Sequence, residues 1–263
     1  MAKFSISTLI SELRRVLFSN CFTQIPLMRL LISSFLALSL ISGCARSPVV
    51  QEAPVTRIMV IPVMPIAKLH TENKGVPLGV LWYSIADRIK SSDFSERMEV
   101  TRKDMGPKLT AALVRQLNAQ GFEAQVLEGV ARSAASPDRI DYQKLPATDP
   151  VLHVYFEEVG MYSARFSKDY VPRVNVGAYL VRPRSEVELY NETIYYGADS
   201  SGNSRTSVPA DARHHWSSFD EIIGKPREVA GSYDDAVNAL AAKIAQNIRA
   251  QAGPASGQSP SAR

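Results

Sequence analysis

The feature that most constrains this chain is a short apolar stretch near its N-terminus that ends in a cysteine. Arg29 precedes the apolar residues 30–41, which are followed by Ser42, Gly43 and Cys44. A basic residue, an apolar stretch of about 7–15 residues and small residues before the cut make up a secretory signal peptide. The stretch is too short to span a bilayer as a helix, which needs about 20 apolar residues. The segment before Cys44 is therefore expected to be removed and to take no part in the folded domain.

The sequence Ile41-Ser42-Gly43-Cys44 resembles the bacterial lipobox position by position. The resemblance implies that the Cys44 thiol is lipidated and that signal cleavage falls between Gly43 and Cys44. Several acyl chains, palmitate among them, would hold the mature N-terminus firmly, because each buried CH2 group contributes about 0.8 kcal/mol. Ala45 rather than Asp follows the cysteine, which in similar lipoproteins implies transfer to the outer membrane. The alternative is a cysteine that merely ends an apolar helix.

Residues 1–27 stand in front of this signal and include Arg14, Arg15 and Cys21 ahead of a second methionine, Met28. We expect either that translation starts at Met28 or that these residues lengthen the basic region of the signal. The expected organisation is a signal peptide over 1–43, a lipidated tether over 44–54, a single domain over 55–251 and a disordered tail over 252–263.

Removal of the signal changes the composition in two ways. It leaves 220 residues with a net charge of +1, because the leader holds more basic than acidic residues. A nearly neutral domain has no strong field to attract nucleic acid, so we expect no nucleic-acid partner. Cys21 is lost and Cys44 is lipidated, so no disulfide and no cysteine for zinc or thiol chemistry remains. The domain must be held together by its core.

Hydrophobic periodicity predicts an α/β (α+β) fold, with a mixed, largely antiparallel sheet and helices packed on one face. The short connection at residues 183–185 predicts an antiparallel hairpin. The expected elements, in chain order, are a strand over 55–63, a helix over 78–91, a helix capped by Asp104 or Gly106 with Pro107 in its first turn and ending at Gly121, a strand over 122–127, a loop over 129–150 with a short helical turn at 138–144, strands over 151–162, 173–182 and 186–196, an irregular loop over 199–231, and a helix from Ser232 to Ile248.

No group of residues has the spacing of a catalytic site, so we expect neither an enzyme nor a bound cofactor. Gly197–Gly202 lacks the spacing of a serine nucleophile elbow. Glu157 and Glu158 are neighbours on a predicted strand and should point to opposite faces of the sheet, which separates the two carboxylates. Adjacent histidines in a loop seldom reach one metal ion, so His214 and His215 predict a structural or surface role and no metal site.

Tyrosines are concentrated in the predicted strands. Tyrosine combines apolar area with a polar group and is enriched at interfaces, although the same pattern fits a packed, half-exposed sheet. The candidate partner surface consists of Tyr155, Tyr179, Tyr190, Tyr195, His214, His215 and Trp216.

The order of elements resembles a group of envelope lipoproteins. The residues that carry the resemblance are the lipobox, the strand at 55–63, the helix end at 113–122, the strand start at 151–154 and the C-terminal helix. The group includes the curli secretion channel lipoprotein, the activators of penicillin-binding proteins and the auxiliary lipoproteins of lipid-transporting ABC systems. The resemblance implies an α/β sandwich that acts as a non-enzymatic accessory component.

The expected function is therefore that of a lipid-anchored protein on the periplasmic face of the outer membrane, which binds another envelope protein. One alternative is a lipid-transport auxiliary protein with an apolar groove. Another is a metal-dependent hydrolase that uses His214, His215 and Asp211. The sequence leaves the oligomeric state open.

Overall fold

A computed structural model describes residues 54–73, 86–163 and 169–253. The signal peptide, Gly43 and Cys44 lie outside the described residues, as do most of the predicted tether and tail and the first part of the helix predicted over 78–91. The elements are β1 (Arg57–Val60), β2 (His70–Asn73), α3 (Ala86–Arg97), α4 (Glu99–Ala119), β3 (Glu123–Val126), a 3-10 turn (Tyr142–Lys144), β4 (Val151–Ser163), β5 (Tyr170–Arg182), β6 (Val187–Gly197), β7 (Ser207–Val208), α5 (Phe219–Gly224) and α6 (Pro226–Ala252).

The described strands form one mixed sheet in the order β3-β1-β4-β5-β6-β7, with β2 also paired to β4. The three long strands β4, β5 and β6 run antiparallel to their neighbours in this series. The shorter strands join in parallel: β3 pairs with β1, both β1 and β2 pair with β4, and β7 pairs with β6. The predicted mixed, largely antiparallel sheet and the β5–β6 hairpin are confirmed.

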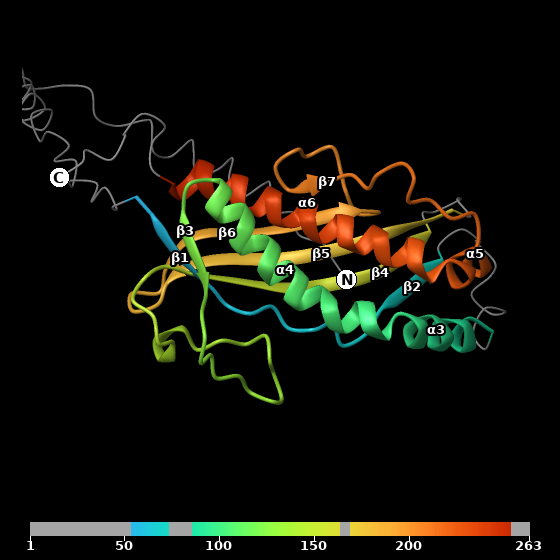
Figure 1. The fold of residues 1–263 in the computed structure, drawn as a ribbon, viewed down its shortest axis with the longest axis horizontal. Helices are drawn as coiled ribbons and strands as arrows, with labels where there is room; N and C mark the ends of the chain where they lie inside the picture. Colours follow the sequence, from blue (N-terminus) through green and yellow to red (C-terminus); the bar gives the residue numbers. More distant parts are fainter. Residues whose placement is uncertain (1–53, 74–85, 164–168, 254–263) are drawn as a thin grey trace, which may run out of the picture. The chain divides into compact units, whose positions relative to one another are not determined.

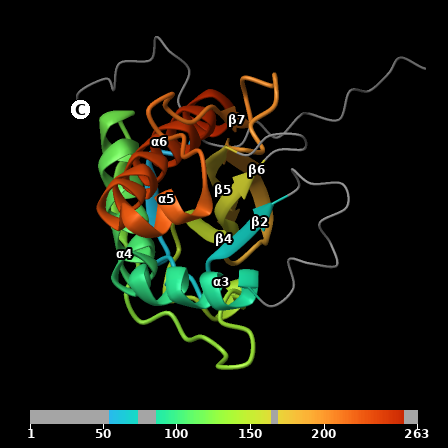
Figure 2. The same cartoon turned by 90° about the vertical axis from the view of Figure 1, so that its right-hand side faces the viewer.

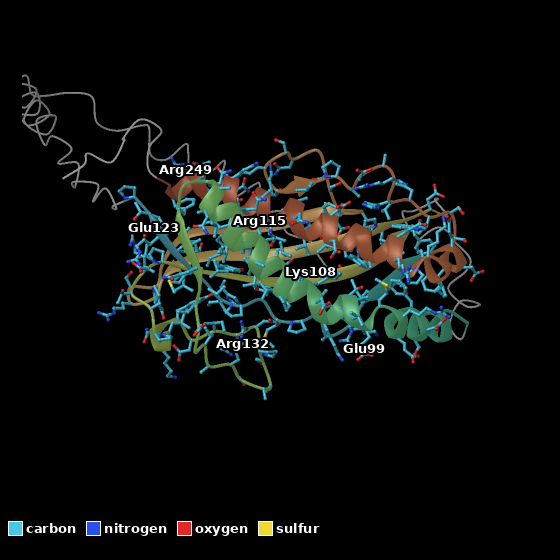
Figure 3. The ribbon with its side chains drawn as sticks, in the orientation of Figure 1. Glu99, Lys108, Arg115, Glu123, Arg132 and Arg249 are labelled. Atoms are coloured by element: carbon cyan, nitrogen blue, oxygen red, sulfur yellow. The ribbon has the colours of Figure 1, made fainter. Side chains whose placement is uncertain are left out.

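Helices α4 and α6 lie against one face of this sheet (Figures 1 and 2). Along β5 the residues on this face, Val174, Val176, Ala178 and Leu180, are fully buried. The two helices also contact each other through polar groups: the Lys108 ammonium lies 2.6 Å from Asp234, and Arg115 donates to the Asn238 side chain at 2.7 Å. Figure 3 labels Lys108 and Arg115 along α4. None of the described helices is long and apolar enough to cross a membrane.

Helix α4 begins earlier than its capping signals predict. Neither Asp104 nor Gly106 caps it, because the helix starts at Glu99 and Pro107 lies inside it. A proline inside a helix removes one backbone hydrogen bond. Burial of Met105 and of the capping residue Met98 in the main core favours the helix through this stretch. The predicted stop is confirmed, since Gly121 follows the helix with a left-handed φ of 85°.

Gly106 lets the chain between β1 and β2 cross α4 at close range. A Cβ atom on Gly106 would lie 2.6 Å from the Val63 carbonyl oxygen, which is shorter than any normal contact. Next to it, the Val63 N–H donates to Thr110 Oγ1 at 2.9 Å, and the Thr110 hydroxyl donates to the Gly106 carbonyl at 3.0 Å. These bonds satisfy buried polar groups where the strand layer meets the helix layer.

The predicted irregular loop over 199–231 contains two short elements and the first turns of α6. The capping residue Ser218 accepts from the Glu221 N–H and starts α5. Helix α6 starts at Pro226 rather than Ser232, and Ser232 is buried within it, where its hydroxyl donates to the Val229 carbonyl at 2.7 Å. Proline at the first helical position was the signal for this earlier start.

Replacement of Gly106 should test the close crossing. Gly106→Ala should lower the free energy of unfolding by about 1–3 kcal/mol, because the added methyl group meets backbone that has little room to move. Gly231→Ala is the matched control: it lies inside α6 with no atom within 4 Å of the new Cβ, and should raise stability by about 1 kcal/mol. Urea unfolding measures both. Equal changes in the two variants would contradict the assignment.

Candidate functional site

The face of the sheet turned away from α4 and α6, here called the open face, carries polar and aromatic side chains. Because side chains alternate along a strand, the residues of β5 on this face are Arg173, Asn175, Gly177 and Tyr179. Two of these polar residues are nevertheless nearly inaccessible, with Arg173 8% and Asn175 5% exposed. The open face is therefore partly covered by other segments.

One cover is the connection between β3 and β4, residues 128–147, here called the wall loop. Part of it packs in a small second core of Ile61, Leu127 and Val151, which the loop residues Val130, Ile140, Leu145 and Ala147 extend. Arg132 fastens the loop, because its guanidinium donates to the Pro137 carbonyl at 2.6 Å and also to the carbonyl of Pro62. Figure 3 labels Arg132 in this loop. The wall loop is thus tied to the end of β1.

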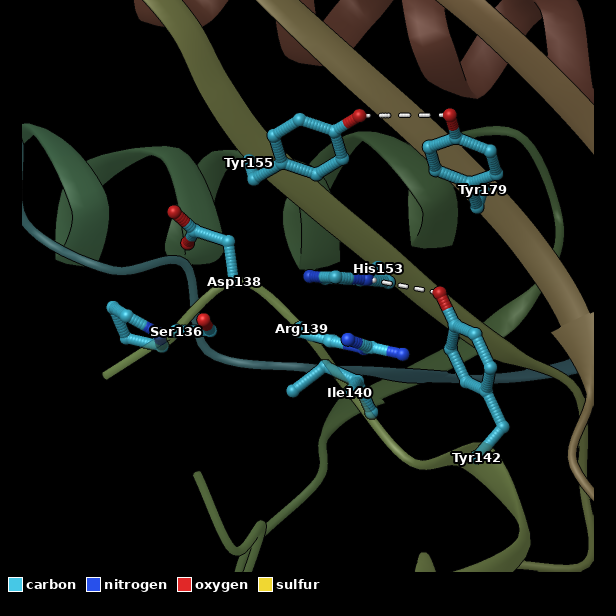
Figure 4. A pocket seen from close by; sticks show the side chains of 9 residues that line it. Ser136, Asp138, Arg139, Ile140, Tyr142, His153, Tyr155 and Tyr179 are labelled. Atoms are coloured by element: carbon cyan, nitrogen blue, oxygen red, sulfur yellow. Dashed lines mark hydrogen bonds between the residues drawn. The ribbon is translucent and has the colours of Figure 1, made fainter. Parts of the chain in front are cut away.

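Between the wall loop and strands β4 and β5 lies a cavity of about 550 Å³, here called the tyrosine pocket. Figure 4 shows its side chains. Its lining residues are Ser136, Pro137, Asp138, Arg139, Ile140, Tyr142, His153, Tyr155 and Tyr179.

His153 forms the most buried part of the pocket lining, at 3% exposure. The Tyr142 hydroxyl lies 3.0 Å from its Nδ1. Burial, with a smaller contribution from the nearby Arg132 charge, lowers the pKa of His153 to about 4, so the ring is neutral at pH 7. Burial raises the pKa of Tyr142 to about 12, so its hydroxyl keeps its proton at pH 7, and the tautomer of His153 sets which of the two groups donates. The other ring nitrogen of His153, Nε2, is buried and has no hydrogen-bond partner among the described residues.

Tyr155 and Tyr179 form the other side of the pocket. Their rings are nearly parallel, at 11°, with centroids 6.0 Å apart, and the Tyr155 hydroxyl donates to that of Tyr179 at 3.5 Å. Gly177 makes this possible, because a Cβ there would lie 2.6 Å from the Tyr155 ring. The hydrogen bond to Tyr179 and burial raise the pKa of Tyr155, so the Tyr155 hydroxyl stays protonated and neutral.

A second polar cluster lies further along the open face. The Arg173 guanidinium contacts Glu158 at 2.6 Å and Asp199 at 2.8 Å, and it stacks on the Tyr162 ring with its central carbon 4.1 Å from the centroid. Asn175 donates to the other Asp199 oxygen at 2.6 Å. These bonds hold the turn after β6 against the sheet, so the cluster has a structural role.

A β-bulge between Phe156 and Glu158 changes the expected alternation on β4. Glu157 and Glu158 were predicted to point to opposite faces. Glu157 instead approaches Gly177 on the open face and accepts from the Thr193 hydroxyl at 3.0 Å, while Glu158 pairs with Arg173 on the same face. The extra residue in a bulge resets the alternation of the strand. Each carboxylate is already bonded to a neighbour.

The predicted partner surface is divided between the two faces of the sheet. Tyr155, Tyr179 and Tyr195 are half-buried on the open face. Tyr190 pairs with Leu180 on the helix-covered face and is 2% exposed. The prediction that Tyr190 lies on a surface is wrong, because its position on β6 has the parity of the core residues.

The loop residues of the predicted surface are also divided. His215 is exposed, whereas Trp216 is 2% and His214 is 7% exposed. Trp216 belongs to the interior because its backbone N–H and carbonyl both bond to Tyr170 at the start of β5. His214 stacks on Trp216 with an interplanar angle of 12° and shares a 2.8 Å bond from Nε2 with Asp235. Placing His214 and Trp216 on an exposed surface was therefore wrong.

His214, His215 and Asp211 do not form the metal site that the hydrolase alternative requires. His214 is bonded to Asp235, and the Asp211 carboxylate accepts from the Arg213 N–H at 3.0 Å. In residues 54–73, 86–163 and 169–253, no group of three or more His, Cys, Asp or Glu side chains could hold a metal ion.

The sequence pattern did not identify His153, Tyr142 and the wall loop as parts of one pocket. The alternation in β4 placed His153 and Tyr155 on one face, which was a usable signal. Tyr142 lies in a loop, and no periodicity indicates which strand such a residue contacts.

Comparison with known proteins found no matching family model and no matching curated protein. Solved structures similar to this chain include a putative neuraminyllactose-binding hemagglutinin homolog from Helicobacter pylori, at 14% identity over 74% of this chain and 84% of that one, with a TM-score of 0.36. Lipoprotein GNA1162 from Neisseria meningitidis matches at 17% identity over 56% of this chain and 88% of that one, with a TM-score of 0.25. Hypothetical protein CT253 from Chlamydia trachomatis matches at 14% identity over 70% and 98%, with a TM-score of 0.27. Identities and TM-scores this low do not establish a shared function.

His153 should make the stability of the protein depend on pH. Its pKa is about 4 in the folded protein and near the ordinary 6.5 when unfolded. Between these values the unfolded chain binds the extra proton, so stability should fall by up to about 3 kcal/mol as the pH drops from 6.5 to 4. Urea unfolding across this range should show a shallower dependence for His153→Gln. The exposed His215→Gln is the control, and an equal change in both variants would contradict the assignment.

Proposed function

We propose that this protein is a lipid-anchored accessory protein of the bacterial cell envelope that binds another envelope protein and is not an enzyme. Its anchor is the lipid on Cys44, which places the domain at the periplasmic face of the outer membrane. The observation that carries the binding role is the presence of three half-buried tyrosines, Tyr155, Tyr179 and Tyr195, on the open face, which the helices leave uncovered.

Tyrosine side chains on a rigid sheet are suited to such a role. A Tyr side chain buries a large apolar ring at a low cost in conformational entropy and keeps a hydroxyl for specific hydrogen bonds. Strands β4 and β5 are fixed by their pairing and by the core beneath them, so these rings are held in position before a partner arrives. The Glu157 and Thr193 side chains, bonded to each other at 3.0 Å, supply polar groups on the same face.

The lipid-transport alternative requires an apolar groove. The apolar residues of β5 are covered by α4 and α6, and the open face carries aromatic rings with polar groups. This arrangement favours a protein partner over an acyl chain.

The anchor is tested by labelling with palmitate in cells. Cys44→Ser should abolish incorporation of the label and release the protein from the membrane fraction, because the lipidated thiol is lost. Cys21→Ser is the matched control and should keep both properties. Ala45→Asp should move the protein to the inner-membrane fraction. Palmitate labelling that persists in Cys44→Ser would disprove the anchor.

The binding face is tested by photo-crosslinking in intact cells. Tyr195→p-benzoylphenylalanine places a photoreactive benzophenone on the open face, where the half-buried Tyr195 ring lies, and should give one discrete crosslinked product. The same replacement at Ala119, exposed at the end of α4, is the matched control and should give none. Crosslinks from Ala119 alone, or from neither position, would count against the sheet face as the binding surface.

A further inference from the structure

The tyrosine pocket holds a buried ring nitrogen without a hydrogen-bond partner. His153 is 3% exposed and lines the pocket, and its Nε2 atom has no partner among the described residues. Figure 4 shows one ring nitrogen at Tyr142 and the other directed away from it, toward the side of the pocket where Asp138 lies. A buried polar atom without a hydrogen bond costs free energy, so it is uncommon in native proteins and points to a ligand that hydrogen-bonds to it.

The tyrosine pair supplies a second hydrogen-bonding group. Tyr155 donates to Tyr179, so the proton of the Tyr179 hydroxyl remains for a ligand. His153 and Tyr179 thus offer two hydrogen-bonding groups on one strand pair, at positions that face each other directly in the register. A hydroxyl group, which both donates and accepts, can bond to His153 Nε2 in either tautomer and can accept from Tyr179.

The charges around the pocket do not favour an anion. Arg139 lines it beside Asp138, and Arg132 lies close enough to act on His153. Against these two cations stand the carboxylates of Asp138, Glu188 near Tyr142 and Glu157 near Tyr155. The carboxylates at least balance the guanidinium groups, so the site provides no excess positive charge for an acidic ligand.

The shape and lining also define the ligand. The volume of about 550 Å³ lies within the usual range of small-molecule pockets, about 300–1,000 Å³. Tyr142, His153, Tyr155 and Tyr179 supply ring faces and edges, and Asp138 and Arg139 offer an acceptor and donors at the rim. A saccharide ring combines apolar C–H faces with hydroxyls that both accept and donate, which matches this lining.

We infer that the tyrosine pocket binds a neutral pyranose, with one sugar hydroxyl hydrogen-bonded to His153 Nε2, a second sugar oxygen accepting from the Tyr179 hydroxyl, and the Asp138 and Arg139 side chains bonding the outward hydroxyls. The inference goes beyond the proposed function, because it assigns a small-molecule ligand and holds whether or not a protein covers Tyr195.

Saturation-transfer difference NMR on the full-length chain in detergent tests the pocket. The probes are the methyl glycosides of glucose, galactose, mannose and N-acetylglucosamine, with methyl glucuronide as an acidic match to the glucoside. At least one neutral glycoside should show saturation transfer, and the glucuronide should bind more weakly than the glucoside. Absence of transfer to every neutral glycoside, or stronger binding of the glucuronide, overturns the inference.

Matched variants locate the site. Tyr179→Phe removes only the hydroxyl and should weaken binding about three- to tenfold, the usual effect of one lost hydrogen bond. Tyr195→Phe makes the same change on the same face outside the pocket and should bind as the unaltered chain does. Equal affinity in both variants would place the sugar elsewhere and overturn the inference. Because Tyr195 is the crosslinking position for the proposed protein partner, failure of that experiment leaves the sugar result unchanged.

Discussion

The burial of one face of β4, β5 and β6 beneath α4 and α6 is the constraint on which the rest of the structure depends. It fixes which alternate residues of each strand are apolar, and therefore which are left for the opposite face. The helices are placed by close backbone contact at Gly106 and by the Val63–Thr110 hydrogen bond. With one face committed to the core, the polar and aromatic residues of the strands collect on the other.

The parts of the fold that could be predicted are those governed by a local period. The apolar positions at Leu109, Leu113 and Leu117 and the stop at Gly121 set the end of α4, and alternation set the three long strands. The start of α4 could not be predicted from its capping signals, because the helix extends on the N-terminal side of Pro107 to Glu99. Burial of Met98 and Met105 in the core favours this extension. The start of α6 was predictable from Pro226 but was missed in a stretch with few apolar residues.

The candidate site was predictable only in part, because the face on which a strand residue lies depends on its position in the strand register. The sequence shows only that the strands are rich in tyrosine. The register places Tyr155 and Tyr179 on the open face and Tyr190 in the core. A bulge shifts the parity again between Phe156 and Glu158. The pocket further requires Tyr142 to meet His153 across a loop, and that contact depends on how Arg132 fastens the wall loop.

The wall loop is built separately from the helix-covered core. It rests on the small cluster around Ile61, Leu127 and Val151 and on the two carbonyl contacts of Arg132. Exchanges of the exposed residues Ser136, Asp138 and Arg139 would thus leave these supports and the main core intact while reshaping one side of the tyrosine pocket. The residues that stabilise the fold are therefore largely distinct from the wall-loop residues that line the pocket. Substitutions in this one loop can change which ligand the pocket binds without altering the main core.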